Sequence, residues 1–135
     1  MTGNSSTPFN GEANCQFNGS TLSVTGTITA TSDVIAYYSS DERFKDNIQT
    51  LTNVLDKLDK VRGVEFDWNQ DQDTYSGHDI GVVAQEIEAA FPELVKDRVD
   101  GFKGVRYEKL TAVLLQAIKE LKEKVETLEK QVNKA

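Results

Sequence analysis

Hydrophobic and polar positions alternate along residues 20–30, and a period of two predicts a β-strand. The apolar positions share one face, and they are Leu22, Val24, Ile28 and Ala30. Residues 33–38 form a short, largely apolar run that predicts a second strand. Two short strands with so little apolar area are not stable alone, so we expect this segment to join a neighbouring sheet, most simply the same segment of other chains.

From residue 51 the spacing of apolar positions changes to three and four residues, which is typical of an amphipathic helix. The residues that share this spacing are Leu51, Leu55, Leu58 and Val61. Thr50 or Thr52 can cap the start of the helix, and Gly63 can end it. Residues 64–68 then alternate again, so they predict a strand.

The next part of the chain predicts several short elements of mixed type. A polar loop over residues 69–78 precedes a strand at 80–83. A helix at 84–91 is expected to end before Pro92, which cannot continue it. Apolar positions on both sides of the Asp100-Gly101 turn then predict a hairpin. The fold class is therefore expected to be α+β.

The last element is a predicted helix over residues 108–134 with a heptad repeat. Its a positions are Ile118, Val125 and Val132, and its d positions are Leu114, Leu121 and Leu128. The alternative is a single amphipathic helix packed on its own domain. The apolar seam is narrow and the charged face is wide, so we favour self-association through a coiled coil.

Charge and composition exclude several classes of function. The chain has 135 residues, a net charge of −7 and a pI near 4.7. These values argue against nucleic acid or an anionic membrane surface as a partner. A single cysteine, Cys15, excludes an internal disulfide and any cysteine-rich metal site. The acidic segment at 67–79 matches no calcium loop, so we expect no metal and no cofactor.

Targeting signals are not recognisable in the sequence. No apolar run approaches the roughly 18 residues that span a bilayer. The polar start of the chain has neither the positive charge nor the apolar stretch of a signal peptide. We therefore expect synthesis in the cytoplasm of the cell that makes the protein.

The composition changes abruptly at Ser40. The 39 residues before it contain no Lys or Arg, and 13 of them are Ser or Thr. From Ser40 onward the chain is rich in charges, so we expect two parts, residues 1–39 and residues 40–135. Ser40 and Lys45, five residues apart at this border, suggest either a junction that is built to be cut or a solvated helix start.

Cleavage by this pair would need a specific geometry. A hydroxyl attacks a peptide carbonyl only when a base takes its proton, and a neutral lysine amine can do so. Because a free lysine has a pKa of about 10.4, desolvation has to lower that value by roughly three units. Five extended residues span up to about 16–18 Å, so either the chain turns at Asp41 or the lysine comes from an adjacent subunit. A carboxylate beside the amine would favour its charged form, so Asp41 is assigned to capping or positioning.

Several motifs then occur in a recognisable order. They are Ser40-Asp41-x-Arg43-x-Lys45-x-x-Ile48, Val64-x-Phe66-x-Trp68, Gly81-x-x-Ala84-Gln85-Glu86, Phe91-Pro92-Glu93 and Val105-x-Tyr107-x-x-Leu110. With the leucine-rich terminal helix, they resemble the C-terminal intramolecular chaperone domain of phage tail spikes and tail fibres, of which the endosialidase tail spikes are the best-known members.

The resemblance implies a homotrimer that guides folding of a fibre shaft and then releases itself. Carried over, Ser40 is the catalytic residue, Lys45 is its partner, and the cut falls between Ser39 and Ser40. Such a protein is a single-turnover serine peptidase that acts only on its own chain or trimer. Residues 1–39 would then be the β end of the shaft. The domain would act in the host cytoplasm during assembly, leaving the mature fibre in the virion tail.

Two other functions stay open on the sequence alone. One is an uncleaved tip of a tail fibre that binds a receptor, and the other is a plain coiled-coil oligomerisation module. His78, the only histidine, lies in a predicted loop next to Gly77. It could orient the cleavage site or simply be a surface residue.

Overall fold

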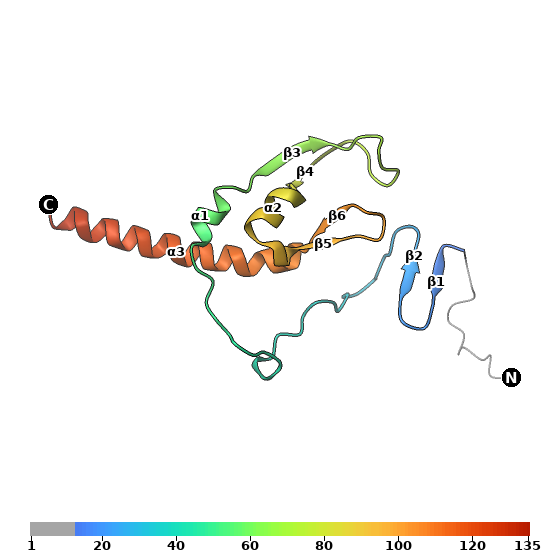
Figure 1. The fold of residues 1–135 in the computed structure, drawn as a ribbon, viewed down its shortest axis with the longest axis horizontal. Helices are drawn as coiled ribbons and strands as arrows, with labels where there is room; N and C mark the ends of the chain where they lie inside the picture. The colour runs from blue at the N-terminus through green and yellow to red at the C-terminus, as the bar shows by residue number, and fades with distance from the viewer. Residues whose placement is uncertain (1–12) are drawn as a thin grey trace. The chain divides into compact units, whose positions relative to one another are not determined.

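The computed structural model describes residues 13–135, and the chain divides into two compact units, Met1–Ser40 and Asp41–Ala135. In the first unit, β1 (Cys15–Phe17) and β2 (Leu22–Val24) pair antiparallel, with Cys15 opposite Val24 (Figure 1). The side-chain oxygen of Asn18 accepts the backbone N–H of Thr21 at 2.8 Å and closes the turn between them. The first twelve residues of the predicted shaft segment lie outside the described residues.

The strand predicted through Ala30 ends at Val24, and the strand predicted at 33–38 is not formed. Tyr37 and Tyr38 are 85% and 74% exposed. The physical reason is the lack of a partner strand, because extended backbone is stabilised only when its N–H and C=O groups are paired. In the single chain the first strand prediction is therefore confirmed only over Leu22–Val24, and the second is not borne out.

The second unit mixes short helices and two-stranded sheets and ends in a long helix (Figure 1). Its elements are η1 (Glu42–Phe44), α1 (Val54–Leu58), β3 (Gly63–Asp67), β4 (His78–Val82), α2 (Ala84–Ala90), η2 (Pro92–Leu94), β5 (Val95–Asp97), β6 (Lys103–Val105) and α3 (Tyr107–Asn133). The mixed helix and strand class and the long terminal helix are confirmed.

β3 and β4 form an antiparallel hairpin in which Asp67 lies opposite His78. Val64 and Phe66 are half-buried, and Gly63, Glu65 and Asp67 are exposed, as the period of two predicts. The position of His78 is a correction, because it begins β4 rather than lying in the preceding loop. Cross-strand pairing with Asp67 extends the strand two residues beyond the predicted start at residue 80.

The segment that follows β4 agrees closely with the sequence pattern. α2 ends at Ala90, just before Pro92 begins the 3-10 turn η2. β5 and β6 pair antiparallel with Val95 opposite Val105. Gly101 lies in the turn between them at φ +85°, a left-handed conformation that favours glycine.

α1 is shorter than predicted and is capped from a distance. It begins at Val54 rather than Leu51, and neither Thr50 nor Thr52 is its N-cap. Its N-cap residue, Asn53, makes no side-chain capping bond. Instead the carboxylate of Glu120, on α3, accepts the N–H groups of Val54 and Leu55, each at 3.0 Å. Glu120 thus ties α1 to the terminal helix.

We expect this tie to depend on pH. The N–H of Val54, followed by that of Leu55, lowers the pKa of Glu120 below its ordinary value of 4.5. A carboxylate with a lowered pKa in the folded state stabilises the fold above its unfolded pKa, and this contribution is lost as pH falls through the folded pKa. Glu120→Gln should therefore unfold at lower urea concentration at pH 7 and lose less stability than the parent chain below about pH 5.

Urea unfolding at fixed protein concentration, followed by circular dichroism, measures both effects. Glu129→Gln, an exposed change on the same helix, is the matched control and should leave the midpoint nearly unchanged. Equal losses in the two variants, or an unaltered pH slope in Glu120→Gln, would show that the capping contact contributes nothing to stability.

The core of the second unit joins α1, α2, η2 and the first half of α3. Its buried residues are Val54, Ile87, Ala90, Phe91, Leu94, Val113 and Ala117. α3 therefore contributes Val113 and Ala117, which are neither a nor d positions of the heptad. Among the described residues, no helix is both long and apolar enough to cross a membrane.

The heptad positions of α3 form a second apolar face that this core does not cover. We call this set of six residues the seam: Leu114, Ile118, Leu121, Val125, Leu128 and Val132. Their exposed fractions run from 46% at Leu114 to 71% at Val132. An amphipathic helix normally buries one apolar stripe, so a helix with a second, exposed stripe has surface left for a partner.

Candidate functional site

The candidate cleavage segment contains a tight turn that begins at Asp41. Asp41 is the N-cap of η1, and its Oδ1 accepts the backbone N–H of Arg43 at 2.9 Å. The N–H of Phe44 donates to the carbonyl of Asp41 at 3.2 Å. The N–H of Lys45 donates to the carbonyl of Glu42 at 3.0 Å and completes the turn. Capping is one of the two roles that the sequence assigns to Asp41.

This turn answers part of the distance problem between Ser40 and Lys45. A 3-10 helix rises about 2.0 Å per residue, against about 3.3 Å for extended chain, so residues 42–44 shorten the path. The sequence leaves two arrangements open, a turn at Asp41 or a lysine from an adjacent subunit. The turn at Asp41 is present within one chain. A lysine supplied by an adjacent subunit does not require this turn.

Arg43 makes an ion pair with the capping carboxylate. Its Nε donates to Oδ1 of Asp41 at 3.0 Å, and its Nη2 donates to Oδ2 at 2.8 Å. The side-chain and backbone hydrogen bonds from Arg43 lower the pKa of Asp41, and the positive charge of Lys45 adds a smaller effect in the same direction. Arg43 therefore favours the ionised form of the Asp41 carboxylate.

Solvent exposure limits what this segment can do in one chain. Residues 39–45 are all exposed, including Ser40 and Lys45. A lysine amine is neutral near pH 7 only when its surroundings are poorly solvated. The exposed surface of a single chain therefore does not provide the poorly solvated surroundings that a lysine base needs.

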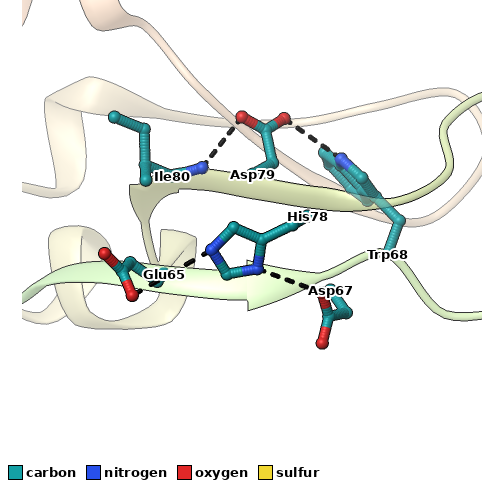
Figure 2. Close-up of polar contacts among 6 residues, drawn as sticks. All are labelled: Glu65, Asp67, Trp68, His78, Asp79 and Ile80. Carbon is teal, nitrogen blue, oxygen red and sulfur yellow. Dashed lines mark hydrogen bonds and ion pairs between the residues drawn. The ribbon is translucent and has the colours of Figure 1, made fainter.

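His78 is held by the neighbouring strand. Figure 2 shows its ring between two carboxylates of β3, with Nδ1 3.1 Å from Oδ1 of Asp67 and Nε2 4.0 Å from Oε2 of Glu65. Asp79, next along β4, accepts the indole N–H of Trp68 at 3.1 Å. These contacts join the two strands of the β3–β4 hairpin, so they give His78 a role in strand pairing.

Residues 13–135 contain no candidate metal site. No group of three or more His, Cys, Asp or Glu side chains there is arranged to hold a metal ion. The side chain of Gln72 instead organises the acidic loop: its Oε1 accepts the N–H groups of Thr74 and Tyr75 at 2.9 and 2.7 Å. Tyr75 then stacks on Trp68 with ring centroids 4.7 Å apart.

Sequence reasoning missed the part played by Arg43. Residues two apart do not face each other on an α-helix, so an Asp-x-Arg pair carries no pairing signal there. At a helix start the geometry differs, because the capping residue folds its side chain back over the first turn. The sequence signal for this contact is the combination of a capping Asp and an Arg two residues later.

Residues 40–96 match the family model described as chaperone of endosialidase, which is named as a peptidase family. The resemblance drawn from the sequence is confirmed, and this part of the chain is a chaperone-of-endosialidase domain. The matched region begins at Ser40, where the composition changes.

The relatives are long tail fibre proteins of bacteriophages. The chain is 35% identical over 101 residues to the long tail fiber protein Gp37 of Salmonella phage S16, covering 70% of this chain and 14% of that protein. It is 34% identical over 103 residues to the Gp37 proteins of Enterobacteria phages K3 and T2, covering 69% of this chain and 8% and 7% of theirs. The chain thus spans only a small part of these relatives' length.

Proposed function

We propose that this chain is the end of a phage tail fibre and carries an intramolecular chaperone, which trimerises the fibre and then cuts itself off between Ser39 and Ser40. The observation that carries the proposal is the family match over residues 40–96. The tail fibre relatives support the fibre context, and the peptidase name of the family supports self-cleavage. Residues 1–39 are the end of the shaft, and residues 40–135 are the chaperone part that leaves.

The proposed reaction is an acyl shift followed by hydrolysis. The hydroxyl of Ser40 attacks the carbonyl carbon of Ser39, in its own chain or a neighbour's, while Lys45 Nζ takes the hydroxyl proton. The C–N bond to Ser40 breaks, and the lysine returns the proton to the leaving amine. Water then hydrolyses the ester between Ser39 and the Ser40 oxygen, so Ser39 ends in a carboxylate and Ser40 regains its hydroxyl. No cofactor takes part.

The exposure of residues 39–45 supports a cut that waits for assembly. Other chains in a trimer would exclude water from Lys45 and let it act as a base. Pairing strands between chains is entropically costly and slow, and a coiled coil that holds three C-termini together raises the effective concentration of the shaft segments. Removal of the chaperone then makes disassembly effectively irreversible, which is kinetic stability. These steps would take place in the host cytoplasm, and the mature fibre would stay in the virion tail.

The seam supports self-association through α3. Six exposed apolar side chains at a and d positions, on a face that the core leaves uncovered, fit a coiled coil. β-branched residues at a with leucine at d favour two strands in parallel coiled coils. We nevertheless propose a trimer, because the resembled family is trimeric and residues 25–38, which form no strand in the single chain, need strands from other chains.

The oligomeric state is a direct prediction. Sedimentation equilibrium of the Ser40→Ala chain, chosen so that no fragment complicates the mass, should give three times the 15.0 kDa of one protomer. The mass should not change as loading concentration is raised further. A mass of two protomers, or of one, would contradict the trimer.

A further inference from the structure

A groove runs along α3 from Gln116 to Gln131, between the helix and residues 50–53. Its volume is about 720 Å³, and Leu128 of the seam lies in its wall. The groove is therefore continuous with the apolar face that the core leaves uncovered. The charged side chains that line it are Asp56, Glu120, Glu123 and Lys124. Three carboxylates against one ammonium give the groove an acidic lining, which suits a basic group.

Two of the three carboxylates are available to such a group. Glu120 is already engaged, because it accepts the N–H groups of Val54 and Leu55. Within the described part of the chain, the side chains of Asp56 and Glu123 form no ion pair and no hydrogen bond. A basic group that enters the groove therefore meets two carboxylates without breaking an existing contact.

The heptad repeat identifies what a second copy of the chain would bring to this groove. Lys124 and Gln131, in the wall of the groove, are g positions of the repeat whose a and d positions form the seam. In a parallel coiled coil the g side of one helix faces the e side of the next. The e positions of α3 are Leu115, Lys122 and Glu129, of which only Lys122 is basic.

Lys122 of the same chain cannot fill the groove. Residues two apart do not share a helix face, so Lys122 lies across α3 from Glu120. Its ammonium is 3.5 Å from the carboxylate of Glu126, and its side chain is 72% exposed. Ala117, the g residue that a parallel partner would place beside it, is buried in the core and carries no charge. Regular pairing between e and g positions therefore leaves Lys122 without a charged partner on the neighbouring helix.

We propose that the groove is a socket for Lys122 of an adjacent copy of this chain, in which Asp56 and Glu123 hold the ammonium. The inference rests on the trimer of the proposed function. The axes of packed helices lie about 8–10 Å apart, a gap that a lysine side chain bridges. Leu51, a wall residue that is 43% exposed, packs on the aliphatic stem of the incoming lysine.

The socket would give the trimer a second function besides holding the chains together. Its wall at residues 50–53 belongs to the same segment as the cleavage junction, only a few residues after Lys45. A neighbour that docks there contacts both α3 and this segment. The socket therefore links assembly of the coiled coil to the part of the chain that is to be cut.

The experiment measures trimer stability by sedimentation equilibrium in the full chain carrying Ser40→Ala, so that self-cleavage plays no part. Lys122→Glu brings like charges together three times in each trimer, so the concentration of half-assembly should rise about tenfold. Lys119→Glu is the matched control, because it makes the same change of charge on the same helix outside the seam and the groove. Glu126→Gln removes the pairing of Lys122 within its own chain. Both of these variants should assemble like the Ser40→Ala chain.

Charge reversal on both sides tests the contact itself. Asp56→Lys added to Lys122→Glu restores opposite charges and should return the concentration of half-assembly to within about twofold of its starting value. A cross-link gives a second measurement that does not depend on stability. With Cys15→Ser, Asp56→Cys and Lys122→Cys, a short bifunctional maleimide should join chains into covalent trimers on a denaturing gel.

The outcomes separate the socket from the function on which it rests. A Ser40→Ala chain that sediments as a monomer would show that the proposed trimer is wrong. If that chain is a trimer, three results overturn the socket alone: Lys122→Glu assembling like Lys119→Glu, no recovery with Asp56→Lys, or cross-links confined to single chains.

Discussion

Ser40→Ala is expected to leave the chain whole while the trimer still forms. The hydroxyl is the proposed nucleophile, and alanine has no atom that can attack the carbonyl of Ser39. Lys45→Ala should slow the cut by about 10²–10⁴-fold, the usual contribution of a positioned general base. A denaturing gel taken at intervals after expression gives the extent of cleavage, and sedimentation checks the trimer.

Ser39→Ala is the matched control, because two adjacent serines stand at the junction. It removes a hydroxyl from the residue that supplies the attacked carbonyl and keeps the proposed nucleophile. Cleavage should continue in this variant. A fragment beginning at residue 40 in the Ser40→Ala chain, or an uncut Ser39→Ala chain, would show that the nucleophile is assigned to the wrong residue.

Replacing Leu121 and Leu128 with aspartate should produce an uncut monomer. Both side chains are more than half exposed in the single chain, so the core of the second unit should tolerate the change. In a trimer the new charges would be buried along the seam, at a cost of several kcal/mol. A monomer leaves Lys45 exposed, without the poorly solvated surroundings that a lysine needs to act as a base.

The control variant introduces two aspartates outside the seam. Lys119→Asp with Lys130→Asp makes the chain still more negative but leaves every a and d position intact. This variant should trimerise and cut normally. If the Leu121→Asp, Leu128→Asp chain ran as a monomer and still cut itself at the parent rate, the dyad would be complete in one chain, and cleavage would not report assembly.

The elements that the sequence predicts well are those whose stability is local. β3 follows from its period of two, the β5–β6 hairpin from its Asp-Gly turn, and α3 from its sustained apolar spacing. α1 was misplaced because its cap comes from Glu120, about 66 residues away in the chain. A local search for a capping side chain finds Thr50 or Thr52 and cannot see a carboxylate on another helix.

The first unit departs from prediction for a different reason. The apolar run at 33–38 has the composition of a strand, but the described part of one chain offers it no partner. A segment with the composition of a strand forms one only when a partner strand is present to pair with it.

The candidate site is also predicted only in part. Ser40, Asp41 and Lys45 can be identified from the sequence. The Asp41–Arg43 contact cannot, because it depends on the geometry of a capped turn.

The most direct test of the account is the intact mass of freshly expressed, purified parent chain. The account predicts two species in place of one, a fragment of residues 1–39 that ends in a carboxylate and a fragment of residues 40–135 whose N-terminus is Ser40. Their summed mass should exceed that of the whole chain by one water, because hydrolysis adds it. A single species with the mass of the uncut 135-residue chain, in a preparation shown to be trimeric, would contradict self-release and leave an uncleaved fibre tip as the better description.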